Sequence, residues 1–158
     1  MNEKRLEAIQ NIYDSNQQLI YVADRKVSGL LLINAVLVSF SVTWGVKEYA
    51  LWTKAIILVA IALSVLSTIM YLITVIPRVS KRASESMLHY KGILGLPKER
   101  YVSTMLGMSD DDLAKDYLDT IHALSSIQMK KNRYLALGSQ FLILSIALLG
   151  LSFIVHNL

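Results

Sequence analysis

The stretch Asp24, Arg25, Lys26 is the first place where charged side chains of this sequence are arranged in a way that could do chemistry. These three residues directly precede an uncharged run, 27–46, that contains Asn34 among its few polar residues. Arg25 and Lys26 are typical of the residues that flank a membrane helix and extend toward anionic headgroups. Contact with anionic headgroups does not explain Asp24, because its charge has the opposite sign.

The acidic run Asp110, Asp111, Asp112 is a second candidate for chemistry. Carboxylates are ligands for Mg²⁺ and Ca²⁺, so a metal site is one interpretation. However, Ser109 stands in the position of a helix N-cap, and Asp112 falls near the third helical residue. Negative charges in a first helical turn also complement the helix dipole. We therefore favour a helix cap over a metal site.

Other catalytic chemistry has little support in the sequence. Cysteine is absent, which excludes thiolate catalysis, disulfides and the usual structural zinc sites. The histidines, His89, His122 and His156, lack the spacing of metal ligands, and no Gly-rich phosphate loop is present. We expect neither enzyme activity nor a catalytic cofactor. The net charge of +4 is accounted for by basic residues at a membrane surface, so we expect no nucleic-acid partner.

Three uncharged segments determine the predicted fold class. The chain has 158 residues, is 54% hydrophobic and has a mean hydropathy of +0.45, which is too apolar for an ordinary soluble domain. At ~1.5 Å per residue, each segment is long enough to cross a hydrocarbon core of ~30 Å. Buried helices of a soluble protein are the alternative, but they usually carry polar faces. We predict an all-α membrane protein, a single domain over 1–158, with transmembrane helices at about 27–46, 55–76 and 134–155 and cytoplasmic segments 1–26 and 78–133.

The lysine and arginine distribution predicts the topology. The amino-terminal tail holds four of these residues, the loop 47–54 holds two and the segment 78–133 holds ten. Because cytoplasmic segments carry the excess of basic residues, we expect the tail and 78–133 in the cytoplasm and the carboxyl terminus outside. Trp44, Tyr49 and Trp52 lie near the predicted outer surface, where aromatic rings favour the interface.

Two stripes of side chains predict how the cytoplasmic segments pack. One stripe in the tail repeats alternately every three and four residues and continues into the first membrane run, as in a coiled coil. It can pack against the stripe after Ser109, giving a cytoplasmic bundle of the N-terminal helix and 78–133, or against a second copy in a homo-oligomer. We favour packing within one chain. The tail stripe is Leu6, Ile9, Tyr13, Asn16, Ile20, Ala23, Val27 and Leu30, and the second is Leu113, Tyr117, Leu124, Ile127 and Tyr134.

The remaining local patterns concern the connections and the interior of the spans. The segment 92–97, GILGLP, predicts a turn or loop, and 97–107 predicts a short helix closed by Gly107. No ionisable residue lies at the centre of a span, which argues against a proton-coupled transporter or an ion pump. One face of the second span carries small residues that favour helix packing, with a water-lined pore as the alternative. This face consists of Ala60, Ser64, Ser67 and Thr68.

Three stretches of the chain are similar to a known family. The sequences ADRKVSGLLLINA (23–35), LHYKGIL (88–94) with Tyr101 after it, and YLDTIHALSSIQMKKNRYLALGSQFLI (117–143) resemble the transmembrane effectors of Pycsar anti-phage systems. The similarity covers about 16–155. It implies a defence effector in the bacterial inner membrane, whose partner cyclase makes cyclic CMP or cyclic UMP upon phage infection. The effector would then impair membrane integrity and cause abortive infection.

The resemblance also implies a site for an anionic nucleotide. In the resting state Asp24 could pair with a basic residue of 78–133, and the nucleotide could compete for that base. The alternative is a local hydrogen bond between Asp24 and Ser28, or exposure of Asp24 to solvent. A structural or assembly membrane protein without a nucleotide ligand is the competing function. The candidate phosphate ligands are Arg25, Lys26, Arg82 and Lys91, and Tyr90 or Tyr101 could stack on the base.

The predicted topology can be tested by a reporter that is active only in the cytoplasm. Fused after Leu158, it should be silent, because an odd number of spans places the two termini on opposite sides. The same reporter fused before the first span is the control and should be active. Activity of the fusion after Leu158 would contradict the three-span topology.

Overall fold

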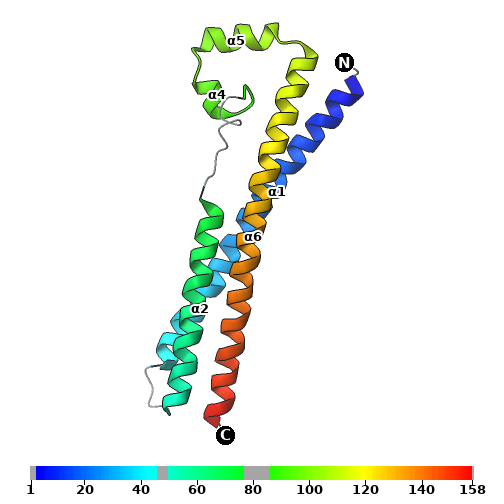
Figure 1. The fold of residues 1–158 in the computed structure, drawn as a ribbon. Coiled ribbons are helices and arrows are strands. Elements are labelled where there is room, and N and C mark those ends of the chain that lie inside the picture. The colour runs from blue at the N-terminus through cyan, green and yellow to red at the C-terminus, as the bar shows by residue number, and fades with distance from the viewer. Residues whose placement is uncertain (1–2, 46–49, 77–85, 158) are drawn as a thin grey trace. The chain divides into compact units, whose positions relative to one another are not determined.

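The computed structural model describes residues 3–45, 50–76 and 86–157, and within these ranges all regular structure is helical. The helices are α1 (Glu3–Gly45), α2 (Leu51–Val75), α4 (Tyr90–Leu94), α5 (Lys98–Gly107) and α6 (Asp110–Asn157) (Figure 1). The predicted all-α class is confirmed.

The described residues fall into two compact units. The tail unit consists of α1 up to Val22, then α4, α5 and α6 up to Met129. The spanning unit consists of α1 from Ala23, the whole of α2, and α6 from Lys130. Both α1 and α6 therefore contribute residues to each unit.

Three helices, α1, α2 and α6, each contain a stretch that is long and apolar enough to cross a membrane. The helix α1 has 43 residues and α6 has 48, so both continue well beyond a single membrane thickness. This confirms that the tail stripe runs into the first span without a break in the helix. The predicted spans lie within these helices except for Val46, which is outside the described residues, and Ile76, which caps α2.

The spanning unit exposes apolar side chains and buries polar ones. Leu32, Leu58 and Ile143 are 69%, 69% and 65% exposed, respectively. Lipid favours this distribution, because apolar side chains can face the acyl chains while polar groups must find partners inside the protein. The pattern is that of a membrane protein and not of the soluble alternative. The polar or charged residues buried in this unit are Asn34, Ser41, Thr53, Ser64, Ser67, Thr74, Lys131, Ser145 and Ser152.

Hydroxyl groups join α2 to α6 through the small-residue face of the second span. Ser145 Oγ donates to the Ala60 carbonyl at 2.8 Å, and the hydroxyls of Ser64 and Ser145 are also 2.8 Å apart. Ser67 Oγ donates to the Gly138 carbonyl at 2.8 Å. These bonds require close approach of the two backbones, which small residues allow. The face therefore serves helix packing, as the sequence predicts.

Gly138 provides the space for the largest fully buried side chain of the spanning unit. The ring of Tyr71 is completely buried and belongs to a cluster with Val27 and Leu142. A Cβ atom at Gly138 would lie 2.7 Å from Cε1 of this ring, closer than van der Waals contact allows. The absence of a side chain at Gly138 therefore determines how closely α6 packs against α2.

The tail unit contains the predicted pairing of the two stripes. Ile9 is buried, and the rings of Tyr13 and Tyr117 meet edge to face with centroids 5.3 Å apart. Ser125 Oγ donates to Asn16 Oδ1 at 3.2 Å. Packing within one chain is therefore confirmed for this unit, and the homo-oligomer stays a prediction.

The helix cap at Ser109 is confirmed. Ser109 Oγ accepts a hydrogen bond from the Asp112 N–H at 3.2 Å and donates to Asp112 Oδ2 at 2.6 Å. This reciprocal pattern satisfies a backbone donor at the start of α6. Asp112 therefore has a structural role at the amino terminus of α6.

The prediction of a loop over 92–97 is partly wrong, because α4 extends to Leu94. His89 Nδ1 accepts a hydrogen bond from the Lys91 N–H at 3.3 Å and so caps this five-residue helix. The cap helps to offset the ~1 kcal/mol that a glycine such as Gly92 costs inside a helix. The short helix predicted over 97–107 is observed as α5, which ends at Gly107 as expected.

The packing at Gly138 can be tested by the substitution Gly138→Ala. We expect a loss of about 1–3 kcal/mol in the free energy of unfolding, because the new methyl group overlaps the Tyr71 ring. Gly150→Ala is the matched control, because a Cβ atom there meets nothing within 4 Å and alanine favours the helix. Unfolding in detergent, followed by circular dichroism, measures both variants. Equal stability of the two variants would contradict the close contact.

Candidate functional site

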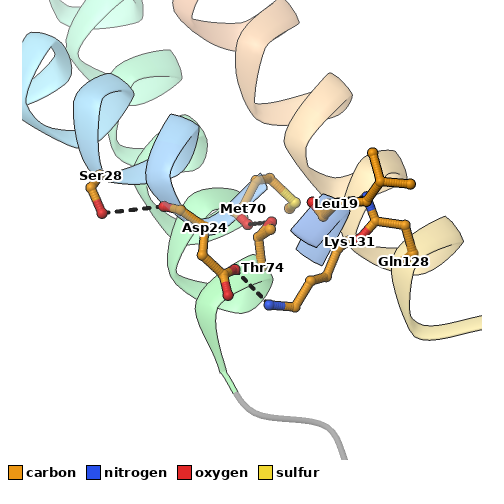
Figure 2. Close-up of polar contacts among 7 residues, drawn as sticks. All are labelled: Leu19, Asp24, Ser28, Met70, Thr74, Gln128 and Lys131. Atoms are coloured by element: carbon orange, nitrogen blue, oxygen red, sulfur yellow. Dashed lines mark hydrogen bonds and ion pairs between the residues drawn. The ribbon is translucent and has the colours of Figure 1, made fainter. Parts of the chain in front are cut away.

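An ion pair joins α1 to α6 within the spanning unit. Lys131 Nζ donates a hydrogen bond to Asp24 Oδ1 at 2.5 Å (Figure 2). The lysine side chain is only 9% exposed, whereas the aspartate side chain is 38% exposed. Loss of the carboxylate would therefore leave a nearly buried charge unpaired, whereas loss of the ammonium group would leave a carboxylate that water can still reach.

Asp24 makes both of the interactions considered from the sequence. Its carboxylate pairs with a basic residue of 78–133, as predicted, and that residue is Lys131. Ser28 Oγ donates to the backbone carbonyl of Asp24 at 3.2 Å and leaves the carboxylate available (Figure 2). The local hydrogen bond therefore accompanies the ion pair and does not replace it.

Lys131 is the functional candidate that sequence reasoning did not single out from the ten basic residues of its segment. A signal for it exists in the stripe of α6, which places Leu124, Ile127 and Tyr134 on one face. Lys131 lies four residues after Ile127 and three before Tyr134, so it occupies a position of that same stripe. A lysine at a buried stripe position predicts an acidic partner, because an unpaired buried charge is costly.

The charge balance of the spanning unit makes this pair difficult to replace. Asp24 is the only acidic side chain in the described ranges of this unit, 23–45, 50–76 and 130–157. No second carboxylate in those ranges can accept from Lys131 if Asp24 is lost. An anion supplied from solution would be the available substitute.

A second polar contact, in the interior of the spanning unit, joins α1 to α2. Asn34 is 1% exposed, and its Nδ2 donates to the Ser64 carbonyl at 2.8 Å and to Thr68 Oγ1 at 2.7 Å. The carbonyl oxygen Oδ1 of Asn34 is also buried, and among the described residues it has no hydrogen-bond partner. The interior therefore holds an unsatisfied acceptor that a water molecule could satisfy.

The predicted nucleotide ligands are divided between the units. Arg25 and Lys26 are exposed on α1 in the spanning unit, next to the ion pair in sequence. Lys91 is exposed on α4 in the tail unit. The structure therefore does not gather the three basic residues within one compact unit.

The other predicted nucleotide ligands are Tyr101, Tyr90 and Arg82. Tyr101 on α5 is half-buried, and its hydroxyl donates to the Met87 carbonyl at 3.4 Å within the tail unit. Tyr90 begins α4, and Arg82 lies outside the described residues. The ligand roles of these residues stay predictions.

Comparison with known proteins gives one family over nearly the whole chain. Residues 8–156 match the model of the Pycsar effector protein domain. The Pycsar effector protein TpPycTM of Treponema porcinum is 28% identical over 96 residues, which cover 57% of this chain and 84% of that protein. No solved structure gives a significant match.

The ion pair can be tested by neutralising each partner alone and both together. Asp24→Asn should lower the free energy of unfolding by about 1.5–3 kcal/mol, because it leaves the ammonium without a charged acceptor. Lys131→Met should cost less, because the carboxylate left behind is partly exposed. The double variant should recover most of the loss, and Ser28→Ala is the control on the same turn of α1. Additive losses in the double variant would contradict a direct pair.

Proposed function

This chain belongs to the Pycsar effector family, and from this premise we propose that it is a bacterial anti-phage defence effector activated in the inner membrane by a cyclic pyrimidine nucleotide. A partner cyclase supplies cyclic CMP or cyclic UMP, and the activated effector impairs membrane integrity and causes abortive infection. The observation that carries the proposal is the family match over residues 8–156, and the ion pair between Asp24 and Lys131 is the contact on which we propose that activation acts. The effector acts on the bilayer and catalyses no reaction.

In the proposed mechanism the ion pair is the resting contact. Its two side chains come from helices that are far apart in sequence, so the pair holds α1 against α6. The cyclic phosphate carries one negative charge and competes with the Asp24 carboxylate for the ammonium group of Lys131. Exchange of one anion for the other keeps the lysine paired and releases α1 from α6. The nucleotide thereby changes helix packing without leaving a buried charge unpaired.

The buried polar groups of the spanning unit provide the route by which release affects the membrane. Hydroxyl groups of Ser64, Ser67 and Ser145 bond across helices in the closed arrangement. When α1 leaves α6 and the α2–α6 contact opens in turn, these groups and the unsatisfied Asn34 oxygen can be hydrated. Hydration offsets part of the cost of separating the helices, so a water-filled path forms at a lower cost than in an apolar bundle.

The proposed orientation places the ion pair at the cytoplasmic end of the spans, where a cytoplasmic cyclase delivers its product. The amino terminus is inside and the carboxyl terminus is outside, as the basic residues predict. At the opposite end of the spanning unit, Trp44 packs against Phe40 and Phe153 with ring centroids 5.5 and 5.7 Å apart. Such an aromatic group is typical of a membrane interface.

Dye release from vesicles tests the proposal directly. The full chain, reconstituted into vesicles that contain a fluorescent dye, should release the dye when cyclic CMP or cyclic UMP is added. Cyclic AMP and cyclic GMP, which carry the same phosphate, should not release it. Asp24→Asn should leak without a nucleotide, because its resting contact is already weakened, whereas Ser28→Ala should stay closed.

One result would contradict the proposed function, and another would contradict the proposed mechanism. One is the absence of dye release with either cyclic pyrimidine nucleotide at millimolar concentration, which would favour a structural membrane protein. The other is a sealed Asp24→Asn variant that still responds to nucleotide as the unmodified chain does. In that case the ion pair would not be the resting contact.

A further inference from the structure

An open groove of about 430 Å³ lies beside the ion pair, between α1 and α6 of the spanning unit. Its volume is within the ~300–1,000 Å³ of typical ligand pockets. The hydroxyl of Ser139 in its wall donates to the Leu135 carbonyl at 2.9 Å and is 3.4 Å from the Tyr71 hydroxyl, which donates to it. The wall is therefore apolar apart from two basic side chains. The lining residues are Arg25, Lys26, Gly29, Leu30, Ile33, Leu135 and Ser139.

The two basic residues at this groove are available to an anion. Arg25 and Lys26 are exposed, and neither side chain has a hydrogen bond or ion pair with another residue in the part of the chain that the structure describes. The neighbouring carboxylate, Asp24, is already bonded to Lys131. Together these four residues carry three positive charges and one negative charge, a net charge of +2. The groove therefore combines a cationic group with an apolar surface.

We propose that this groove binds an anionic phospholipid, with its phosphate at Arg25 and Lys26 and an acyl chain along Gly29, Ile33 and Leu135. Basic residues next to apolar surface on membrane helices bind such headgroups, and their side chains extend to the level of the phosphates. The lining helices are long and apolar enough to cross a membrane, so lipid has direct access to the groove. A free cyclic nucleotide shares the phosphate but has no apolar chain to cover Ile33 and Leu135. The assignment requires only the membrane location and does not depend on nucleotide activation.

Gly29 offers a way to fill the groove without disturbing the helices. A Cβ atom at this position would meet no heavy atom within 4 Å, so a side chain has room. A leucine there would occupy space that the proposed acyl chain needs. Gly150 also has free space but does not line the groove, so Gly150→Leu is the matched control.

Native mass spectrometry of the purified full chain tests the proposal. The delipidated protein is titrated with phosphatidylglycerol, with phosphatidylcholine of the same acyl chains, and with cyclic CMP. We expect one phosphatidylglycerol per chain to bind about tenfold or more tightly than phosphatidylcholine, because both lipids offer a phosphate but only phosphatidylcholine also brings a cation to the two basic residues. Gly29→Leu should weaken both lipids about tenfold, whereas Gly150→Leu should not.

The charge variants separate the lipid from the nucleotide. Substituting both Arg25→Gln and Lys26→Gln should abolish the preference for phosphatidylglycerol, and it should weaken phosphatidylcholine binding less, because the choline cation already offsets the charge of that lipid's phosphate. Lys54→Gln, which removes an exposed basic residue of α2 outside the groove, should change neither.

Three results would overturn the proposal. The first is equal binding of the two lipids to the unmodified chain, and the second is unchanged lipid binding by Gly29→Leu. The third is loss of cyclic CMP binding in the Arg25 and Lys26 variant while the lipid preference persists, which would assign both residues to the nucleotide. If the Arg25 and Lys26 variant fails to fold, the proposal is tested by lipid binding to Gly29→Leu and by the comparison of the two lipids on the unmodified chain.

Discussion

The proposed mechanism depends on one constraint, which is that a nearly buried ammonium group in the spanning unit needs an anionic partner. Lys131 is 9% exposed through its side chain, and Asp24 is the only acidic side chain in the described part of the spanning unit. A lysine in this position must have an anion, because the cost of an unpaired charge rises as water is removed. In the proposed mechanism the contact between α1 and α6 is therefore both a structural requirement and a point of control, since an external anion can take the place of Asp24.

The interior of the spanning unit fits this form of control. Without a hydrophobic force between helices in lipid, the packing depends on close backbones and on hydrogen bonds between helices. Gly138 allows the backbones of α2 and α6 to approach closely. The hydroxyl groups of Ser64, Ser67 and Ser145 provide hydrogen bonds between these helices. Such contacts are individually modest, so an arrangement of this kind can be reorganised by a change in one strong interaction. An apolar groove with two available basic residues lies beside that interaction, so the proposed lipid and nucleotide contacts lie at the same end of the helices.

Much of the fold could be predicted, because membrane-spanning helices need long uncharged runs and packed helices need apolar side chains at regular spacing. The three uncharged runs identified the spanning helices, and the stripe through Ile9 and Tyr13 identified a packing face that the structure confirms. The helix α4 was not predicted from the sequence. The two glycines in the segment 92–97 indicated a loop, and this signal is stronger than that of a helix cap formed by the His89 side chain. The partner of Asp24 was predicted only as a class, since many basic residues were available. Pairing Lys131 with it required the register of α6 against α1, which depends on three-dimensional contacts such as those of Tyr71 on α2 with Gly138 of α6 and Val27 of α1.

The central claim is that a cyclic pyrimidine nucleotide releases α1 from α6, and a distance between these helices tests it most directly. The chain has no cysteine, so spin labels can be placed at Ser28→Cys and Ala136→Cys, two exposed positions of the spanning unit. Pulsed electron paramagnetic resonance in lipid vesicles then gives the distance between the labels with and without cyclic CMP or cyclic UMP. We predict a single narrow distribution in the resting protein that shifts to longer distances with the nucleotide and not with cyclic AMP. An unchanged distribution in samples where calorimetry shows the nucleotide to be bound would contradict the account.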